Sequence, residues 1–244
     1  MELRFLHFYP DLMNLYGSYA NVSVLKRYLE NLGHTVTVTP VLPGQELSLD
    51  GVDFWYMGAG TERAQRAALA DFARFGPAVK AAAEADGTML FAGTAMELLG
   101  RTITTMDGTV YDGIALAEFA TVQGKRRLVE DVYGATDLYP EPVVGFMNKC
   151  GVITGVETPL LTSVSLGYGN EGERMPEGFH WKNVFASELT GPILVKNPRL
   201  LETVAAAILA RRGAALPEER PADPYAEAGY AITAEQLRLR AQRN

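Results

Sequence analysis

The sequence predicts an α/β fold with a mixed, mainly parallel central sheet, because short apolar runs alternate with helical segments along its first hundred residues. Each of these runs is followed by a turn or a glycine-containing loop. The runs expected to form buried strands are Leu3–Phe8, 35–39, Val52–Met57 and Thr88–Ala92.

Helical segments lie between these runs. Apolar residues recur at helical spacing over residues 22–32, and Ser18 is a candidate cap for that helix. The alanine-rich segment Glu62–Ala85 predicts a long helix, which Gly76–Pro77 should break or kink. Another short helix is expected to begin at Ala95.

The second half of the chain has a different pattern. Its β-rich runs are short and separated by turns, which predicts an antiparallel extension of the same sheet. These runs are Ala117–Val122, Arg126–Val132 and Val143–Met147. Leu200–Leu209 is expected to be the final core helix.

The end of the chain is rich in proline and charge. We expect one domain over residues 1–213 and a tail over residues 214–244. Within that tail, 217–224 reads as a linker and Thr233–Arg243 as a small amphipathic helix.

Composition excludes several classes of protein. The formal net charge is −7, so the basic surface that a nucleic-acid-binding protein needs is missing. No apolar run approaches the ~20 residues that span a bilayer, and we expect neither membrane insertion nor a signal peptide. Cys150 is the single cysteine, which excludes an internal disulfide and a cysteine-based zinc site. A cytoplasmic protein without metal or cofactor is expected.

Two loops lie where ligands bind in open α/β sheets, beyond the carboxyl ends of strands. Gly58–Thr61 follows the third expected strand, and Gly93–Ala95 follows the fourth. Glycine lets backbone N–H groups approach a substrate, and a sharp strand-to-helix turn is the geometry of a nucleophile elbow. Glycine at such turns is routine, so the loops alone favour a structural role.

A set of longer motifs resembles the GatD-like glutaminase subunits of lipid II isoglutaminyl synthase, in the cobyric-acid-synthase-like class of glutamine amidotransferases. The resemblance covers residues 3–212 and implies a class I glutamine-amidotransferase-like, flavodoxin-like fold of three layers. The matching blocks are Asp11–Asn21, Gly58–Gln65, Met96–Gly100, Gly124–Leu128, Gly145–Asn148, Gly167–Asn170 and Trp181–Pro198.

The resemblance also implies an activity and a partner. Subunits of this family hydrolyse glutamine to glutamate and ammonia. A MurT-like subunit of the Mur-ligase family then uses ATP and the ammonia to amidate a D-glutamate carboxylate of the peptidoglycan stem. A heterodimer with such a ligase is therefore expected.

The catalytic pair of the family is missing from this sequence. The position of its cysteine falls at Gly93 or Thr94, and the position of its histidine falls at Thr190. A glutaminase needs a thiolate and a base beside it. We therefore expect a pseudo-glutaminase with a structural or binding role, and glutamine binding is without support. The alternative is an active amidotransferase that uses Thr94 or Cys150 as a non-standard nucleophile.

Other residues are candidates for contact with a substrate. Arg127 either binds a carboxylate, which suits a guanidinium, or is a solvated residue on a strand. The three histidines are expected to be structural or surface residues. The candidate substrate-binding set is Gly58, Gly60, Gly93, Thr94 and Arg127.

Overall fold

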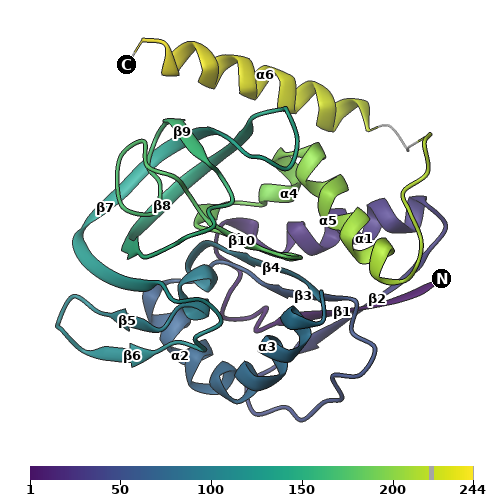
Figure 1. The fold of residues 1–244 in the computed structure, drawn as a ribbon, viewed down its shortest axis with the longest axis horizontal. Coiled ribbons are helices and arrows are strands. Elements are labelled where there is room, and N and C mark those ends of the chain that lie inside the picture. The colour runs from purple at the N-terminus through teal and green to yellow at the C-terminus, as the bar shows by residue number, and fades with distance from the viewer. Residues whose placement is uncertain (220–222, 244) are drawn as a thin grey trace.

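The central sheet confirms the predicted α/β fold. The computed structural model describes residues 1–219 and 223–243, and its first sheet has six strands in the order β10-β11-β4-β3-β1-β2 (Figure 1). All neighbours in it pair in parallel except β10, which is antiparallel to β11. The strands are β1 Glu2–Phe8, β2 Thr35–Val41, β3 Phe54–Met57, β4 Thr88–Ala92, β10 Phe179–Trp181 and β11 Val184–Ser187.

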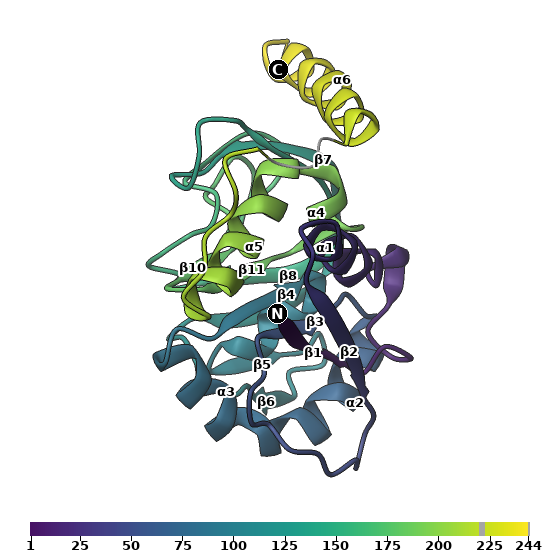
Figure 2. The same cartoon turned by 90° about the vertical axis from the view of Figure 1, so that its right-hand side faces the viewer.

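Helices cover both faces of this sheet, which gives the three layers (Figure 2). Successive strand residues serve opposite faces: Phe5 packs with α1 and α5, whereas Leu6 packs with α2 and α3. The predicted break at Gly76–Pro77 separates α2 from α3. The helices are α1 Ala20–Asn31, α2 Glu62–Phe72, α3 Gly76–Glu84, α4 Ile193–Lys196 and α5 Pro198–Arg211, with short 3-10 turns η1 Leu15–Gly17, η2 Ala73–Phe75 and η3 Gly93–Leu99.

The β-rich second half forms a separate sheet, so the prediction that it extends the first sheet was wrong. This second sheet has the order β12-β8-β7-β5-β6, and β9 pairs with β7. Its strands are β5 Thr102–Thr104, β6 Val110–Asp112, β7 Ala120–Ala135, β8 Val143–Thr154, β9 Ser163–Leu166 and β12 Leu189–Thr190. Residues 120–122 of one expected run and all of the run 126–132 belong to one 16-residue strand, β7, whose register against β8 shifts between Gln123 and Leu128. This irregularity interrupts the apolar pattern, which is why the sequence predicted two strands.

Two helix boundaries also differ from expectation. The helix α6 runs over Pro224–Ala241, longer than the predicted one, and its Leu237 packs on Val144 and Leu166 of the second sheet. Residues 220–222 of the predicted linker lie outside the described part of the chain. Ser18 does not cap α1, because Tyr19 occupies that position. Its hydroxyl instead lies 2.6 Å from the Tyr56 hydroxyl.

Candidate functional site

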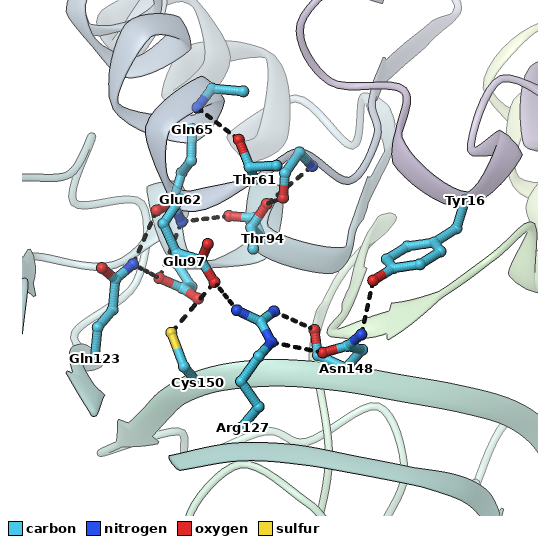
Figure 3. A network of polar contacts seen from close by, with 12 residues as sticks. Tyr16, Thr61, Glu62, Gln65, Thr94, Glu97, Gln123, Arg127, Asn148 and Cys150 are labelled. Carbon is cyan, nitrogen blue, oxygen red and sulfur yellow. Dashed lines mark hydrogen bonds and ion pairs between the residues drawn. The ribbon is translucent and has the colours of Figure 1, made fainter. Parts of the chain in front are cut away.

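The two glycine-containing loops contact each other at the carboxyl ends of β3 and β4. These strands are parallel neighbours, so their following loops leave the same edge of the sheet. Gly60 N–H donates to Thr94 Oγ1 over 3.0 Å, and that hydroxyl donates back to the Gly60 carbonyl over 2.9 Å. The Thr94 hydroxyl is buried and has no base beside it in these contacts (Figure 3). It is therefore a poor nucleophile.

Gly93 occupies the turn directly after β4. Its φ is +61°, a left-handed conformation that glycine adopts without strain. A Cβ at this position would lie 2.5 Å from the Cβ of Ala59 and 3.6 Å from Cγ2 of Thr190. Non-bonded carbon atoms are normally 3.5–4 Å apart. A side chain on Gly93 therefore requires Ala59 to move.

Thr190 closes the other side of this position. It lies in β12, which pairs with β8, and only 5% of its surface is exposed. Its hydroxyl donates to the Phe146 carbonyl over 3.1 Å, so the methyl group is what Gly93 faces. Gly93, Ala59 and Thr190 together form a small neutral contact, which we call the closed corner.

The three histidines lie in other contacts. His7 is in β1, with its ring 5.0 Å from Tyr56, and burial lowers its pKa to about 4. His34 lies beside the N-terminal amine. His180 pairs with Phe185 in the β10–β11 hairpin.

The Asp11–Asn21 motif holds the first glycine loop in place. Leu15 N–H donates to the Ala59 carbonyl over 2.8 Å, and Ala59 N–H donates to Ser18 Oγ over 3.2 Å. A Cβ on Gly58 would lie 2.5 Å from the Met13 carbonyl oxygen, so only glycine fits there. The loop donors at residues 59 and 60 are thus already used within the protein.

Arg127 joins β7, β8 and α2. Its guanidinium donates to Asn148 Oδ1 and to Glu62 Oε1, each over 2.7 Å. Asn148 in turn donates to the Tyr16 hydroxyl over 2.7 Å (Figure 3). A substrate carboxylate would have to displace Glu62, so a substrate-binding role for Arg127 stays a prediction.

Cys150 lies in β8 beside this network. Its Sγ donates to Glu62 Oε1 over 3.3 Å. Burial and the Glu62 carboxylate raise the pKa of the thiol to about 12, which keeps it protonated at neutral pH. The geometry therefore gives no support to Cys150 as a nucleophile.

A buried polar network, which was not predicted from the sequence, surrounds Glu97. Glu97, in η3, accepts hydrogen bonds from the amide nitrogens of Gln65 and Gln123 over 2.9 and 3.1 Å. Burial and the nearby Glu188 raise the pKa of Glu97 to about 8, so it is protonated at neutral pH. The signal in the sequence was a charged residue inside the apolar block 95–99.

The network continues through an ion pair in the core. Lys149 Nζ lies 2.5 Å from Glu188 Oε2, and both side chains are at most 2% exposed. Glu177 accepts from the Ser187 hydroxyl and from Glu188 N–H, and burial raises its pKa to about 7. We call Gln65, Glu97, Gln123, Lys149, Glu177, Ser187 and Glu188 the buried network.

Within residues 1–219 and 223–243, no group of three His, Cys, Asp or Glu side chains is placed to hold a metal ion. In the same residues, no helix has both the length and the apolar character to cross a bilayer.

Comparison with known proteins identifies the family. Two curated relatives are lipid II isoglutaminyl synthase (glutamine-hydrolyzing) subunits GatD. The one from Staphylococcus aureus strain N315 is 30% identical over 212 residues, which are 87% of this chain and 86% of that protein. The one from Streptococcus pneumoniae strain R6 is 30% identical over 202 residues, 82% of this chain and 77% of that protein.

A solved structure supports the fold alone. PurLQS from Thermotoga maritima aligns with a TM-score of 0.51 at 11% identity, over 86% of this chain and 97% of that one. Residues 4–198 match the model of the CobB/CobQ-like glutamine amidotransferase domain. Together with the two relatives, this match shows that the chain belongs to the CobB/CobQ-like glutamine amidotransferase family.

Proposed function

We propose that this protein is the GatD-like subunit of a complex that amidates lipid II in peptidoglycan synthesis, and that it no longer hydrolyses glutamine. The first half of the proposal is supported by two relatives at 30% identity, both subunits of lipid II isoglutaminyl synthase. The amidotransferase unit would comprise residues 1–213, with residues 214–244 as a tail, and the protein would act in the cytoplasm.

The closed corner carries the second half of the proposal. Gly93 directly follows β4 and has a left-handed φ, as the nucleophile of a strand–turn–helix elbow does. We therefore assign the family's nucleophile position to Gly93 rather than Thr94, and its histidine position to Thr190. Ala59 occupies the space that a cysteine side chain on Gly93 would need. Both groups of a thiolate–histidine pair are thus replaced, and the space between them is filled.

We propose a MurT-like subunit of the Mur-ligase family as the partner. A subunit that has lost its catalytic activity is retained when it binds a partner subunit. The amidotransferase fold of this protein is intact outside the closed corner. The ligase would then take ammonia from solution or from another source. Its contact with this subunit would lie near the opening of the former glutaminase site, because an ammonia-producing ancestor had to face its synthetase there.

Co-expression with the Mur-ligase-like protein of the same genome tests this proposal. We expect a one-to-one complex in size-exclusion chromatography, burying on the order of 1,600 Å². Amidation of lipid II by the complex should proceed with ammonium and fail with glutamine. Separate elution at micromolar concentrations, with amidation unchanged by this subunit, would refute the partnership. Amidation driven by glutamine would refute the loss of glutaminase activity.

A further inference from the structure

Unpaired cations gather beside the former glutaminase site. Most Lys and Arg side chains make ion pairs, as Arg74, Arg199 and Arg240 do. By contrast, Arg63, Arg66 and Lys125 make no ion pair or hydrogen bond within residues 1–219 and 223–243. These three residues form a local positive region in a protein whose net charge is −7.

These side chains line one cavity of about 570 Å³. Arg63 and Arg66 come from α2, and three residues' separation puts them on neighbouring positions of one helix face. Lys125 and Arg127 come from β7, and Tyr111 comes from the β5–β6 hairpin. A volume of 300–1,000 Å³ is typical of sites for small molecules.

The cavity has an excess of positive charge. Its carboxylates are Glu62 and Asp107. Glu62 is paired with Arg127 at 2.7 Å, which cancels both charges. Hydrogen bonds from Thr105 and Thr109 lower the pKa of Asp107 to about 2, so this residue stays negative. Arg63, Arg66 and Lys125 therefore face a single uncompensated carboxylate.

Such an arrangement favours the binding of an anion, which would be attracted by all three cations. Like charges on adjacent helix positions repel each other, and arginine holds phosphate through a planar fork of donors. A monocarboxylate would satisfy one cation, whereas a phosphate group carries up to two charges and several acceptor oxygens. Tyr111 is 37% exposed on the opposite hairpin, which leaves its ring accessible to a ligand.

We propose that this cavity binds a small phosphorylated ligand with at least two negative charges, held by Arg63, Arg66 and Lys125. Of the candidate site residues, Arg127 and Cys150 line this cavity, whereas Gly93, Thr94 and Thr190 do not, so it adjoins the former glutaminase site without including the closed corner. The ligand is a free small molecule rather than a protein segment, because cations from two separate elements converge on a hollow of small-molecule size.

Calorimetric titration of the full chain with pyrophosphate, ADP and adenosine tests the proposal. We expect pyrophosphate and ADP to bind, adenosine not to bind, and the affinity to fall as salt is raised. A tighter Kd for ADP than for pyrophosphate would show that the nucleoside adds contacts, as Tyr111 allows. Failure of both anions to bind at millimolar concentration in low salt would overturn the proposal.

Matched variants locate the site. Arg63→Gln combined with Arg66→Gln should weaken pyrophosphate binding by about 10-fold or more, because both charged hydrogen-bond donors of the helix are removed. Lys125→Gln should weaken it by a smaller factor. Lys80→Gln is the control, because Lys80 is also unpaired but lies on α3 outside the cavity. Equal weakening by Lys80→Gln would show only a general charge effect. If the arginine variants spare pyrophosphate binding but weaken the ligase complex, the cavity is a protein contact and the proposal fails.

Discussion

The closed corner and the buried network each include one residue of the same turn, η3, and they differ in charge and in side-chain size. The corner is made of Gly93, Ala59 and Thr190, which are small and uncharged, and it has no room for a Cβ on Gly93. The network places Glu97 and the Lys149–Glu188 pair in the core. The proposed loss of a catalytic side chain from the corner leaves no buried charge behind, and the methyl group of Ala59 occupies the space next to Gly93. A buried charge cannot lose its partner at low cost, because the remaining group has no water to solvate it.

The largest effect should come from breaking the buried ion pair. We predict that Lys149→Met lowers the free energy of unfolding by about 3–5 kcal/mol, because Glu188 then remains buried beside Glu97 without a cation. Urea unfolding at pH 7 measures this. The control is Lys182→Met, since the Lys182 pairs with Glu84 and Asp86 are exposed and should contribute at most ~1 kcal/mol. If both variants lose the same free energy of unfolding, burial does not make the Lys149–Glu188 pair more important for stability than an exposed pair.

A smaller effect should come from the corner. Gly93→Cys should lower the free energy of unfolding by about 2–4 kcal/mol, from the left-handed φ and from the clash with Ala59. Adding Ala59→Gly should relieve the clash, so the double-mutant cycle should give a favourable coupling of about 1–3 kcal/mol. Gly33→Cys is the control. Gly33 also has a positive φ but open space around it, so this variant should show only the cost of the left-handed backbone. If the effects of Gly93→Cys and Ala59→Gly on the free energy of unfolding are strictly additive, Ala59 does not occupy the space that a side chain on Gly93 needs.

The effect of pH is the smallest of the three when it is counted per pH unit. Glu97 has a folded pKa of about 8, above its ordinary value of 4.5, so the folded state holds a proton that the unfolded state releases. Its contribution to stability is complete below pH 4.5 and is lost as the pH rises through 8, at up to ~1.4 kcal/mol per pH unit. Glu177 acts in the same direction, with a pKa of about 7. His7 acts in the opposite direction below pH 6.5, because its folded pKa is about 4.

Glu97→Gln isolates this contribution. The variant should lose stability less steeply than the wild type between pH 5 and 8 in urea titrations, because the titrating proton is gone while the hydrogen bonds from Gln65 and Gln123 can persist. His7 is common to both proteins and cancels in the difference. Identical slopes would show that Glu97 does not hold a proton in the folded state.

Local pattern was enough to predict the strands β1 to β4 of the first sheet, but β10 and β11 were not predicted. Leu3–Phe8 forms β1, and Gly76–Pro77 separates α2 from α3, because strand length and proline geometry act within a few residues. The second sheet depends on non-local pairing. The polar residues 124–127 interrupt the apolar pattern of β7, whereas its long antiparallel pairing with β8 keeps the strand together.

The candidate site was also predictable only in part. Motif spacing indicated Gly93 and Thr190 as site positions, and the structure brings both to one place. Ala59 was missed, because an alanine between two glycines carries no signal until its distance to Gly93 is known. Glu188 was missed because its partner Lys149 is 39 positions earlier in the sequence and meets it only in the folded protein.

Release of glutamate from glutamine by the purified protein in complex with its ligase partner tests the central claim most directly. Losing both members of a catalytic unit removes most of the rate, typically by several orders of magnitude. The account predicts no glutamate above the background of the ligase alone, and no difference between the wild type and the Thr94→Ala and Cys150→Ser variants. Robust hydrolysis that either substitution abolishes would contradict it.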